Sequence, residues 1–330
     1  MSENDRYETY EAVPAGCNLL DAHQRELDLY GIPPRPDPGN SAERQLHDFW
    51  IKLLSPPFHP RKAEISKLNL RRFQTQPPAN IESSLNWSGA LISPPWPKRI
   101  TLAVAGWIVP EVRHPSLPAL FTQPDTSKTL VWVGLDGHNG RLPKSSLPQI
   151  GTFHAPDDSP EGRHFAWLDW WHHVPTRKEQ EISKIRNLQI CPGQEIMAGL
   201  WVMISGDVSF FIKNQCTGEY RCTLIKRQML PDIEPLGSSA EWVVERPTEP
   251  NGKLFPLADY GCVNFKYCMA RAAETPLGPG PVMTLADNGR MIKMRKAFAD
   301  PYRTVYVSRA ERRHDDDGSI GVTCTFHAPT

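Results

Sequence analysis

The sequence predicts an all-β protein, an antiparallel β-sandwich preceded by a partly helical N-terminal extension. From about residue 81 apolar residues alternate with a period of two, which is typical of strands with two different faces. Glycine-containing turn dipeptides separate these segments, and no helical pattern lies between them. The chain also has 33 prolines among 330 residues, and proline interrupts helix interiors, so a mostly helical protein is disfavoured.

The N-terminal extension comprises residues 1–80. Residues 18–31 have a helical pattern that ends at Gly31, a suitable glycine for a helix C-terminus. A stiff Pro-rich segment, IPPRPDP, follows. A second helix is expected over residues 40–54, where Asn40 and Glu43 resemble a capping box. Its apolar residues recur at helical spacing and form one face that must dock on the body of the protein: Leu46, Phe49, Trp50, Leu53 and Leu54.

The remaining residues, 81–330, are expected to form the sandwich. We expect strands over residues 85–92, 100–109, 129–136, 163–174, 195–204, 208–214, 240–246, 262–270, 303–308 and 320–326. Turns are expected at Thr217-Gly218, Asn251-Gly252, Asn288-Gly289 and Asp317-Gly318.

The composition narrows the class of partner. Lys and Arg together number 37, as do Asp and Glu, so the net charge does not favour binding to nucleic acid or to an anionic membrane. The polar N-terminus lacks the pattern of a signal peptide, and no apolar run reaches the roughly 18 residues of a membrane span, which together predict a soluble, cytoplasmic protein. The seven cysteines are expected to be free thiols, although a disulfide between Cys216 and Cys222 could close a hairpin. Neither a metal nor a cofactor is expected, since the adjacent His172 and His173 point to opposite faces of a strand.

Three strands place carboxylates among aromatic or small residues on one face. Since side chains alternate along a strand, these faces carry Trp132, Gly134 and Asp136; Phe165, Trp167, Asp169 and Trp171; and Glu241, Val243 and Glu245. Together they suggest a groove with flat apolar walls and acidic groups, although any single strand is equally typical of a half-exposed edge. Glu241 and Glu245 lie about 13 Å apart by strand rise, too far to share a proton.

These motifs resemble the eqolisins, a family of glutamic peptidases found mainly in fungi. The matching segments occur in the same order as in that family: NWSGA at 86–90, WIVP at 107–110, WVGLDG at 132–137, LPQIG at 147–151, AWLDW at 166–170 and AEWVVE at 240–245. The resemblance implies a β-sandwich of the concanavalin A-like jelly-roll type. It also implies that Gln149 and Glu245 form the catalytic pair, and that the cleft is lined by Trp87, Trp132, Asp136, Trp167 and Asp169.

In such a pair Glu245 removes a proton from the water that attacks a peptide carbonyl and later returns it to the leaving amine. Gln149 donates its amide N–H to the developing oxyanion, which is typically worth roughly 3 kcal/mol of barrier. The balanced charge, the 11 histidines and the polar extension leave two alternatives open. One is proton-transfer chemistry on a small molecule of secondary metabolism, an isomerisation, cyclisation or elimination. The other is a sandwich that only binds a ligand. The extension is expected to buttress the sandwich or, alternatively, to cover its groove.

Overall fold

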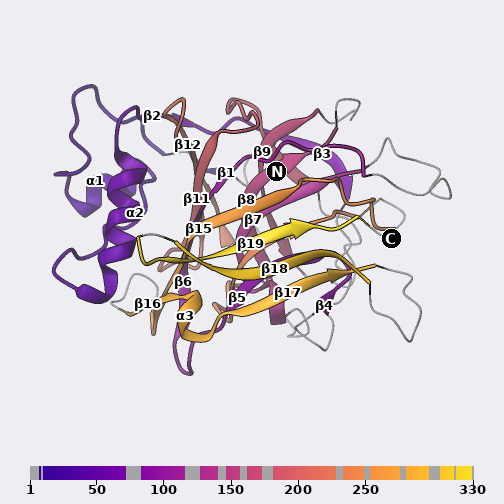
Figure 1. Ribbon diagram of the computed structural model, residues 1–330. Helices are drawn as coiled ribbons and strands as arrows, with labels where there is room; N and C mark the ends of the chain where they lie inside the picture. The colour runs from indigo at the N-terminus through magenta and orange to yellow at the C-terminus, as the bar shows by residue number, and fades with distance from the viewer. Residues whose placement is uncertain are drawn as a thin grey trace.

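The computed structural model confirms the all-β prediction, with two packed sheets and with α1 (Gln24–Leu29) and α2 (Arg44–Leu54) together on one side of the molecule (Figure 1). It describes residues 7–8, 10–71, 83–115, 127–139, 146–156, 162–172, 181–227, 233–248, 253–275, 280–296, 305–315 and 317–328. The turn expected at Asn251-Gly252 lies outside the described residues.

The first sheet, which we call the site sheet, has six central strands, each antiparallel to its neighbours. In spatial order they are β10 (Glu181–Ile185), β9 (His164–His172), β8 (Ser146–His154), β7 (Thr129–Leu135), β14 (Ala240–Glu245) and β5 (Trp87–Ile92). At its two edges β3 (Ile65–Arg71) pairs with β10, and β17 (Arg290–Arg295) pairs with β5.

The second sheet, the back sheet, is also antiparallel along its main strands. In spatial order they are β13 (Glu219–Ile225), β12 (Val208–Asn214), β11 (Glu195–Val202), β6 (Arg99–Ile108), β15 (Cys262–Ala273), β19 (Ile320–Phe326) and β18 (Tyr306–His314). Strand β17 also pairs with β18 and so joins the two sheets. Short elements complete the described fold: β1 (Tyr7–Glu8), β2 (His59–Lys62), β4 (Ser83–Ser84), β16 (Val282–Thr284), α3 (Leu285–Asn288) and the 3-10 turns Ser41–Glu43 and Gly137–Asn139.

The hydrophobic core lies between the two sheets and follows the strand alternation. Val131 and Val133 of β7 belong to it, together with Ala103 and Ala105 of β6. Trp132, between the two valines, belongs instead to a second apolar cluster on the opposite face of the site sheet. The same alternation in the back sheet directs Leu102 and neighbouring residues outward. Each sheet therefore has two buried faces.

The described helices of the extension cover the outer face of the back sheet. In Figure 1, α1 (Gln24–Leu29) and α2 (Arg44–Leu54) lie beside the ends of the back-sheet strands. All five apolar residues expected on the second helix are buried in one cluster with outward-facing residues of the back sheet, among them Leu102, Val104, Met197, Trp201 and Phe211. These helices thus lie on the far side of the sandwich from the outer face of the site sheet.

The helix ends agree only in part with the sequence. Gly31 follows α1 with a φ of +65°, as expected for a glycine after a helix C-terminus. The capping box expected of Asn40 and Glu43 is wrong. Asn40 does accept a hydrogen bond from the Ala42 N–H, but Glu43 pairs with Arg271 at 3.0 Å, a partner 228 positions away that local spacing could not reveal.

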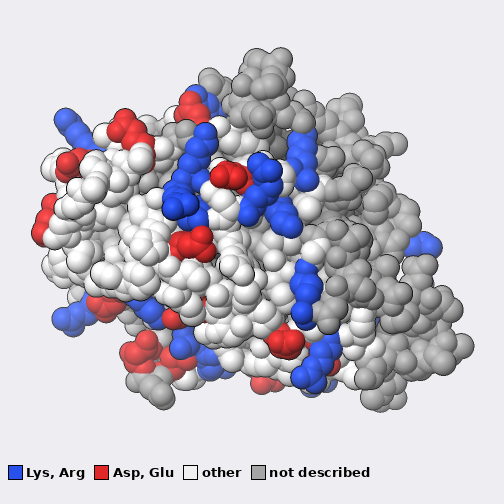
Figure 2. Space-filling view, turned by 90° about the horizontal axis from the view of Figure 1, so that it is seen from above, with Lys and Arg blue, Asp and Glu red and all other residues white. Residues whose placement is uncertain are grey.

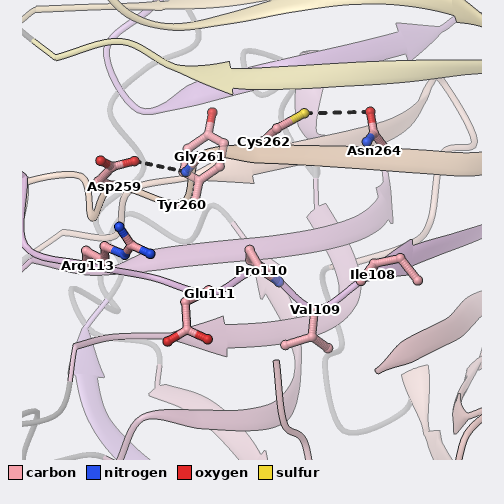
Figure 3. A pocket seen from close by; sticks show the side chains of 10 residues that line it. All are labelled: Ile108, Val109, Pro110, Glu111, Arg113, Asp259, Tyr260, Gly261, Cys262 and Asn264. Atoms are coloured by element: carbon pink, nitrogen blue, oxygen red, sulfur yellow. Dashed lines mark hydrogen bonds between the residues drawn. The ribbon is translucent and has the colours of Figure 1, made fainter. Parts of the chain in front are cut away.

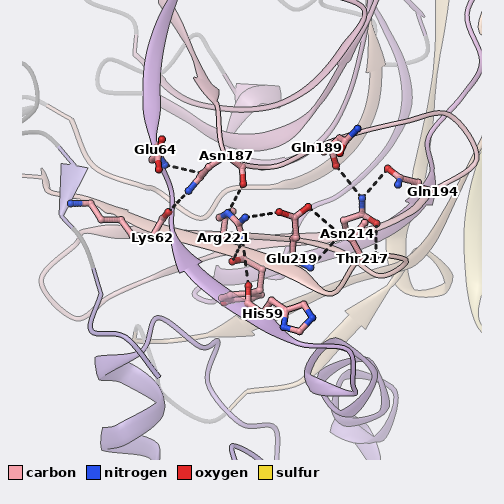
Figure 4. A network of polar contacts seen from close by, with 11 residues as sticks. His59, Lys62, Glu64, Asn187, Gln189, Gln194, Asn214, Thr217, Glu219 and Arg221 are labelled. Atoms are coloured by element: carbon pink, nitrogen blue, oxygen red, sulfur yellow. Dashed lines mark hydrogen bonds and ion pairs between the residues drawn. The ribbon is translucent and has the colours of Figure 1, made fainter. Parts of the chain in front are cut away.

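Buried polar groups fasten the extension to the back sheet. Arg221 donates to the backbone oxygens of Asn187 and His59 and to the Glu219 carboxylate, as Figure 4 shows. Beside it, the buried Lys213 ammonium donates to the backbone oxygens of Leu53 and Ser55 at the end of α2, both at 2.8 Å. Burial lowers the pKa of Lys213 to about 8. These contacts satisfy carbonyls that the helix end leaves without an internal partner.

Charged side chains of both signs occur side by side on the described surface. On the face seen in Figure 2, Lys and Arg side chains lie close to Asp and Glu side chains. One such pair is Arg186 with Glu64, whose charged atoms are 4.0 Å apart. Among the helices that the structure describes, none has the length and apolar character needed to cross a bilayer.

Candidate functional site

The strand register places the sequence-predicted site residues in three adjacent rows on the outer face of the site sheet. The rows run across β5, β14, β7, β8 and β9. Row 1 is Trp87, Glu245, Leu130, Phe153 and Phe165; row 2 is Gly89, Val243, Trp132, Gly151 and Trp167; row 3 is Leu91, Glu241, Gly134, Gln149 and Asp169. Six of the seven predicted residues therefore share one face, and Asp136 lies just beyond the end of β7.

Gln149 is fully buried, and its amide makes no hydrogen bond with the residues that the structure describes. Its side chain is 0% exposed, and among the described residues neither Oε1 nor Nε2 has a hydrogen-bond partner. A primary amide offers two N–H donors and one carbonyl acceptor, and leaving such a group buried and unpaired costs roughly 1–3 kcal/mol. In native proteins almost every buried polar group has a hydrogen-bond partner, which can be a water molecule, an ion or a ligand.

Glu245 is also buried but is held by two N–H donors. Trp132 Nε1 donates to Oε2 at 2.8 Å, and Asn86 Nδ2 donates to Oε1 at 3.4 Å. Asn86 is itself fixed through Ser84, whose hydroxyl donates to Asn86 Oδ1 at 3.1 Å. N–H donors of this kind favour the carboxylate form over the acid. The geometry suits a positioned base.

In the strand register, Trp132 of β7 lies midway between Gln149 of β8 and Glu245 of β14. Its indole Nε1 contacts Glu245, and the far edge of the same ring reaches the space above Gly134, where an added Cβ would lie 3.0 Å from Trp132 Cζ3 and 3.1 Å from Gln149 Cβ. Gly151 leaves room for the base of this side chain, since a Cβ there would lie 2.6 Å from Trp132 Cβ. Trp87 contacts the indole edge-on at 5.1 Å between centroids. The indole thus forms a floor between the two predicted catalytic groups.

Gln149 and Glu245 are not joined by a hydrogen bond in the described structure. They are two strands and four residues apart, which on a flat sheet is about 16 Å between Cα atoms. Each side chain reaches ~5 Å from its Cα, so roughly 6 Å remains when the two lean toward each other. That gap has room for a water molecule and the carbonyl that it would attack.

Glu241 is a site residue to which the sequence reasoning gave no chemical role. It lies in row 3, opposite Gly134, with Gln149 as the next residue across. Oε1 accepts hydrogen bonds from Ser239 Oγ at 2.5 Å and from the His138 backbone N–H at 3.2 Å, whereas Oε2 is buried without a partner among the described residues. Burial, followed by the neighbouring Asp136 charge, raises its pKa to about 8 against the hydrogen bonds that lower it. Glu241 is therefore largely protonated at neutral pH.

Asp136 holds a loop. Its two carboxylate oxygens accept hydrogen bonds from the Leu236 and Ser238 backbone N–H groups and from the Ser238 hydroxyl, at 2.6–3.0 Å. Burial raises its pKa to about 6 although these donors oppose the shift. Asp136 also has a positive φ of 71°, which turns the chain at the end of β7. These contacts support a structural role, and a contact with substrate stays a prediction.

The other predicted lining residues are buried around the rows. Trp167 lies beside Gly151 in row 2, Asp169 beside Gln149 in row 3, and Trp87 at the end of row 1. Their exposed fractions are at most 6%. The sheet therefore supplies both aromatic and acidic groups next to Gln149.

A separate cavity of about 580 Å³ opens where β6 ends and β15 begins (Figure 3). Figure 3 shows Glu111 and Arg113 on one side of it and Asp259, Cys262 and Asn264 on the other. None of the predicted site residues lines it. Within the described ranges, no group of three or more His, Cys, Asp or Glu side chains is arranged to hold a metal ion.

Comparisons with known proteins agree with this architecture. Residues 85–300 match the model of the Peptidase A4 family. Scytalido-glutamic peptidase bound to a transition-state analogue inhibitor superposes with a TM-score of 0.52 at 16% identity, covering 74% of this chain and 99% of that one. SCP-B, a member of the eqolisin family in complex with the tripeptide Ala-Ile-His, gives the same values. Aspergilloglutamic peptidase from Aspergillus niger aligns over 61% of this chain at 19% identity and a TM-score of 0.44, covering 99% of its own.

No match was found among curated protein sequences. At 16% identity the structural similarity shows the fold alone. The family model matches about two thirds of the sequence and therefore shows the family. The sandwich, the ordered motifs and this match lead to one conclusion: the chain belongs to the Peptidase A4 family, the eqolisins.

Proposed function

We propose that this protein hydrolyses peptide bonds with Gln149 and Glu245 as its catalytic pair. The observation that carries the proposal is the buried, unpaired amide of Gln149 on the same face as a carboxylate that Trp132 and Asn86 hold in place. The amide of Gln149 can bind a substrate carbonyl through its N–H, and the two N–H donors of Trp132 and Asn86 fix Glu245 as a base.

In this mechanism a water molecule sits in the gap between the two side chains, above the Trp132 indole. The Glu245 carboxylate removes its proton as the water oxygen attacks the scissile carbonyl carbon. The Gln149 N–H donates to the carbonyl oxygen, where negative charge develops. Glu245 then returns the proton to the leaving amine as the C–N bond breaks. Trp132 and Asn86 act as positioning residues through the N–H groups that they donate to Glu245.

The substrate class follows from the shape and polarity of the rows. An extended peptide presents alternating amide groups and side chains, and the aromatic rings of rows 1 and 2 offer flat apolar surfaces to such a chain. The second hypothesis, acid/base chemistry on a small molecule, uses the same pair, and no contact in the described structure favours it over peptide hydrolysis.

Digestion of casein from pH 2 to pH 8 tests the proposal. We expect hydrolysis by the unmodified protein, a loss of about 10²–10⁴-fold in kcat for Glu245→Gln and of about 10²–10³-fold for Gln149→Ala. Glu195→Gln is the matched control, since it removes a carboxylate from the back sheet that pairs with Lys52. Failure of the folded protein to cleave casein at any pH, or full activity of the Glu245→Gln variant, would contradict peptide hydrolysis by this pair.

A further inference from the structure

Two buried polar groups on the site sheet lack a partner and lie next to each other across a glycine. In row 3, Glu241 and Gln149 both pair with Gly134, from opposite sides. Glu241 Oε2 and both amide atoms of Gln149 have no hydrogen-bond partner among the described residues. Both side chains are 0% exposed. The strand register, rather than the sequence spacing, brings these groups together.

The distance between them suits a shared ligand. Two strand spacings separate their Cα atoms, about 10 Å, and each side chain reaches ~5 Å. Gly134 between them has no side chain, and the nearest side-chain atom above it is Cζ3 at the edge of the Trp132 ring. An oxygen atom beside this ring edge could accept hydrogen bonds from both groups.

The polarity of the two groups defines the ligand. Gln149 offers N–H donors and an acceptor. Glu241 Oε1 already accepts from Ser239 and His138, so the partnerless Oε2 is the atom left to carry the acid proton. A carboxylic acid Oε2–H is a donor, so the pair is complementary to a carbonyl oxygen flanked by an N–H, which is a peptide amide.

We propose that Glu241 is a further catalytic residue, which donates its Oε2–H to the substrate carbonyl oxygen opposite the Gln149 amide. This inference rests on the proposed peptide hydrolysis and extends it: the developing oxyanion then has two donors, one from each side of Gly134. No proton is transferred by Glu241, since its hydrogen bond strengthens as charge develops and relaxes when the tetrahedral intermediate collapses.

The surroundings of Glu241 keep it in the acid form at neutral pH. Burial raises its pKa to about 8, and the neighbouring Asp136 adds to the shift. Two other charged residues belong to row 3 or its edge, namely Asp169 on β9 and Arg290 on β17, which pairs with Leu91. His138 lies in the adjacent turn, and burial and the Arg290 charge lower its pKa. These surroundings keep Glu241 as a neutral hydrogen-bond donor, whereas Glu245, which accepts from Trp132 and Asn86, is the group that takes up and returns the proton.

Kinetics of casein cleavage test the catalytic role. We expect Glu241→Ala to lower kcat by about 10²–10³-fold with little change in KM, and Glu241→Gln, which keeps an N–H donor, to recover activity to within about tenfold. The decline of kcat that we expect near pH 8 in the unmodified protein should be absent in Glu241→Gln. Melting temperatures and circular dichroism of both variants establish that each is folded, and Glu195→Gln is again the control. Unchanged kcat in a folded Glu241→Ala variant would overturn the inference.

A binding measurement separates this inference from the proposed hydrolysis. Acetyl-Ala-Ile-amide, a capped peptide without titrating groups, is titrated calorimetrically into the protein between pH 6 and pH 9. We expect affinity to fall up to tenfold per pH unit above pH 8 in the unmodified protein and to stay constant in Glu241→Gln. Parallel pH profiles, or no binding at all, would reject the role of Glu241. A Glu241-dependent profile together with full activity in Glu245→Gln would instead reject the hydrolytic pair and retain the amide site.

Discussion

The buried imidazole of His154 makes a specific prediction about stability in acid. His154 is on the core side of β8, within a chain of hydrogen bonds. Trp107 Nε1 donates to Thr152 Oγ1 at 3.0 Å, Thr152 Oγ1 lies 2.8 Å from His154 Nε2, and His154 Nδ1 lies 2.9 Å from His164 Nδ1. Burial, followed by the His164 charge, lowers the pKa of His154 well below its usual 6.5.

The direction of this shift fixes the sign of the pH effect on stability and sets an upper limit to its size. Below pH 6.5 the unfolded chain binds a proton at His154 that the folded protein does not bind, so stability falls as the pH falls. The slope for one group is about 1.4 kcal/mol per pH unit until the folded-state pKa is reached. If His154 stays neutral in the folded protein over the whole range, this amounts to about 2.3 kcal/mol between pH 6.5 and pH 4.5, which is the upper limit for one group, and the typical stability of a domain is about 5–15 kcal/mol.

Urea denaturation at pH 7.5, 6.5, 5.5 and 4.5 measures the effect. His154→Gln retains an amide that can contact Thr152 but cannot titrate. The contributions of all other ionisable groups cancel in the difference in unfolding free energy between this variant and the unmodified protein. We expect that difference to change by up to about 2.3 kcal/mol in favour of the variant between pH 6.5 and pH 4.5. The exposed His314 provides the control, His314→Asn, which should follow the unmodified protein. Parallel curves for His154→Gln and the unmodified protein would refute the reasoning.

Three other predictions concern packing and positioning. Gly151→Ala would place a Cβ 2.1 Å from Val131 O and 2.6 Å from Trp132 Cβ, and should lower the unfolding free energy by about 1–3 kcal/mol in urea titrations, whereas Gly39→Ala in the extension should change it little. Trp132→Phe removes the N–H that Glu245 accepts and should lower kcat by about 10-fold or more while KM changes little, because only the base loses its positioning. Deleting residues 1–62 exposes the apolar outer face of the back sheet and should cause association in light scattering, whereas a monomeric protein with higher turnover would show that the extension covers the groove.

Strand alternation was enough to predict which residues share a face. Trp132, Gly134, Glu241 and Glu245 were placed correctly relative to their own strands, because side chains alternate regardless of tertiary context. The motif order was likewise enough for the family, since six short segments occurred in sequence. Local pattern and resemblance thus gave the architecture.

Register between strands could not be obtained from the sequence. The pairing of Glu241 with Gly134 joins segments 107 residues apart, and the pairing of Gly134 with Gln149 depends on the register of two strands that are joined by a loop. For this reason the sequence identified Glu245 through resemblance and overlooked Glu241. The ion pair of Glu43 with Arg271, which is distant in the sequence, was missed for the same reason.

Several strands were missed because their residues are poor strand formers. Strand β8 contains Pro148 and Gly151, which local rules associate with edges and bulges, and yet it has a neighbour on each side. Strand β17, RMIKMR, is short, has one β-branched residue, Ile292, and does not alternate strictly between charged and apolar residues. Tertiary pairing overrides weak propensity in both cases.

The most direct test of the central claim is the structure of the Glu245→Gln variant crystallised with an uncleaved peptide. The account predicts that the peptide lies over the Trp132 indole, with one carbonyl oxygen about 2.7–3.1 Å from Gln149 Nε2 and a water molecule between that carbonyl carbon and the side chain at position 245. A peptide bound elsewhere, or one whose carbonyl groups all lie beyond hydrogen-bond reach of Gln149, would contradict it.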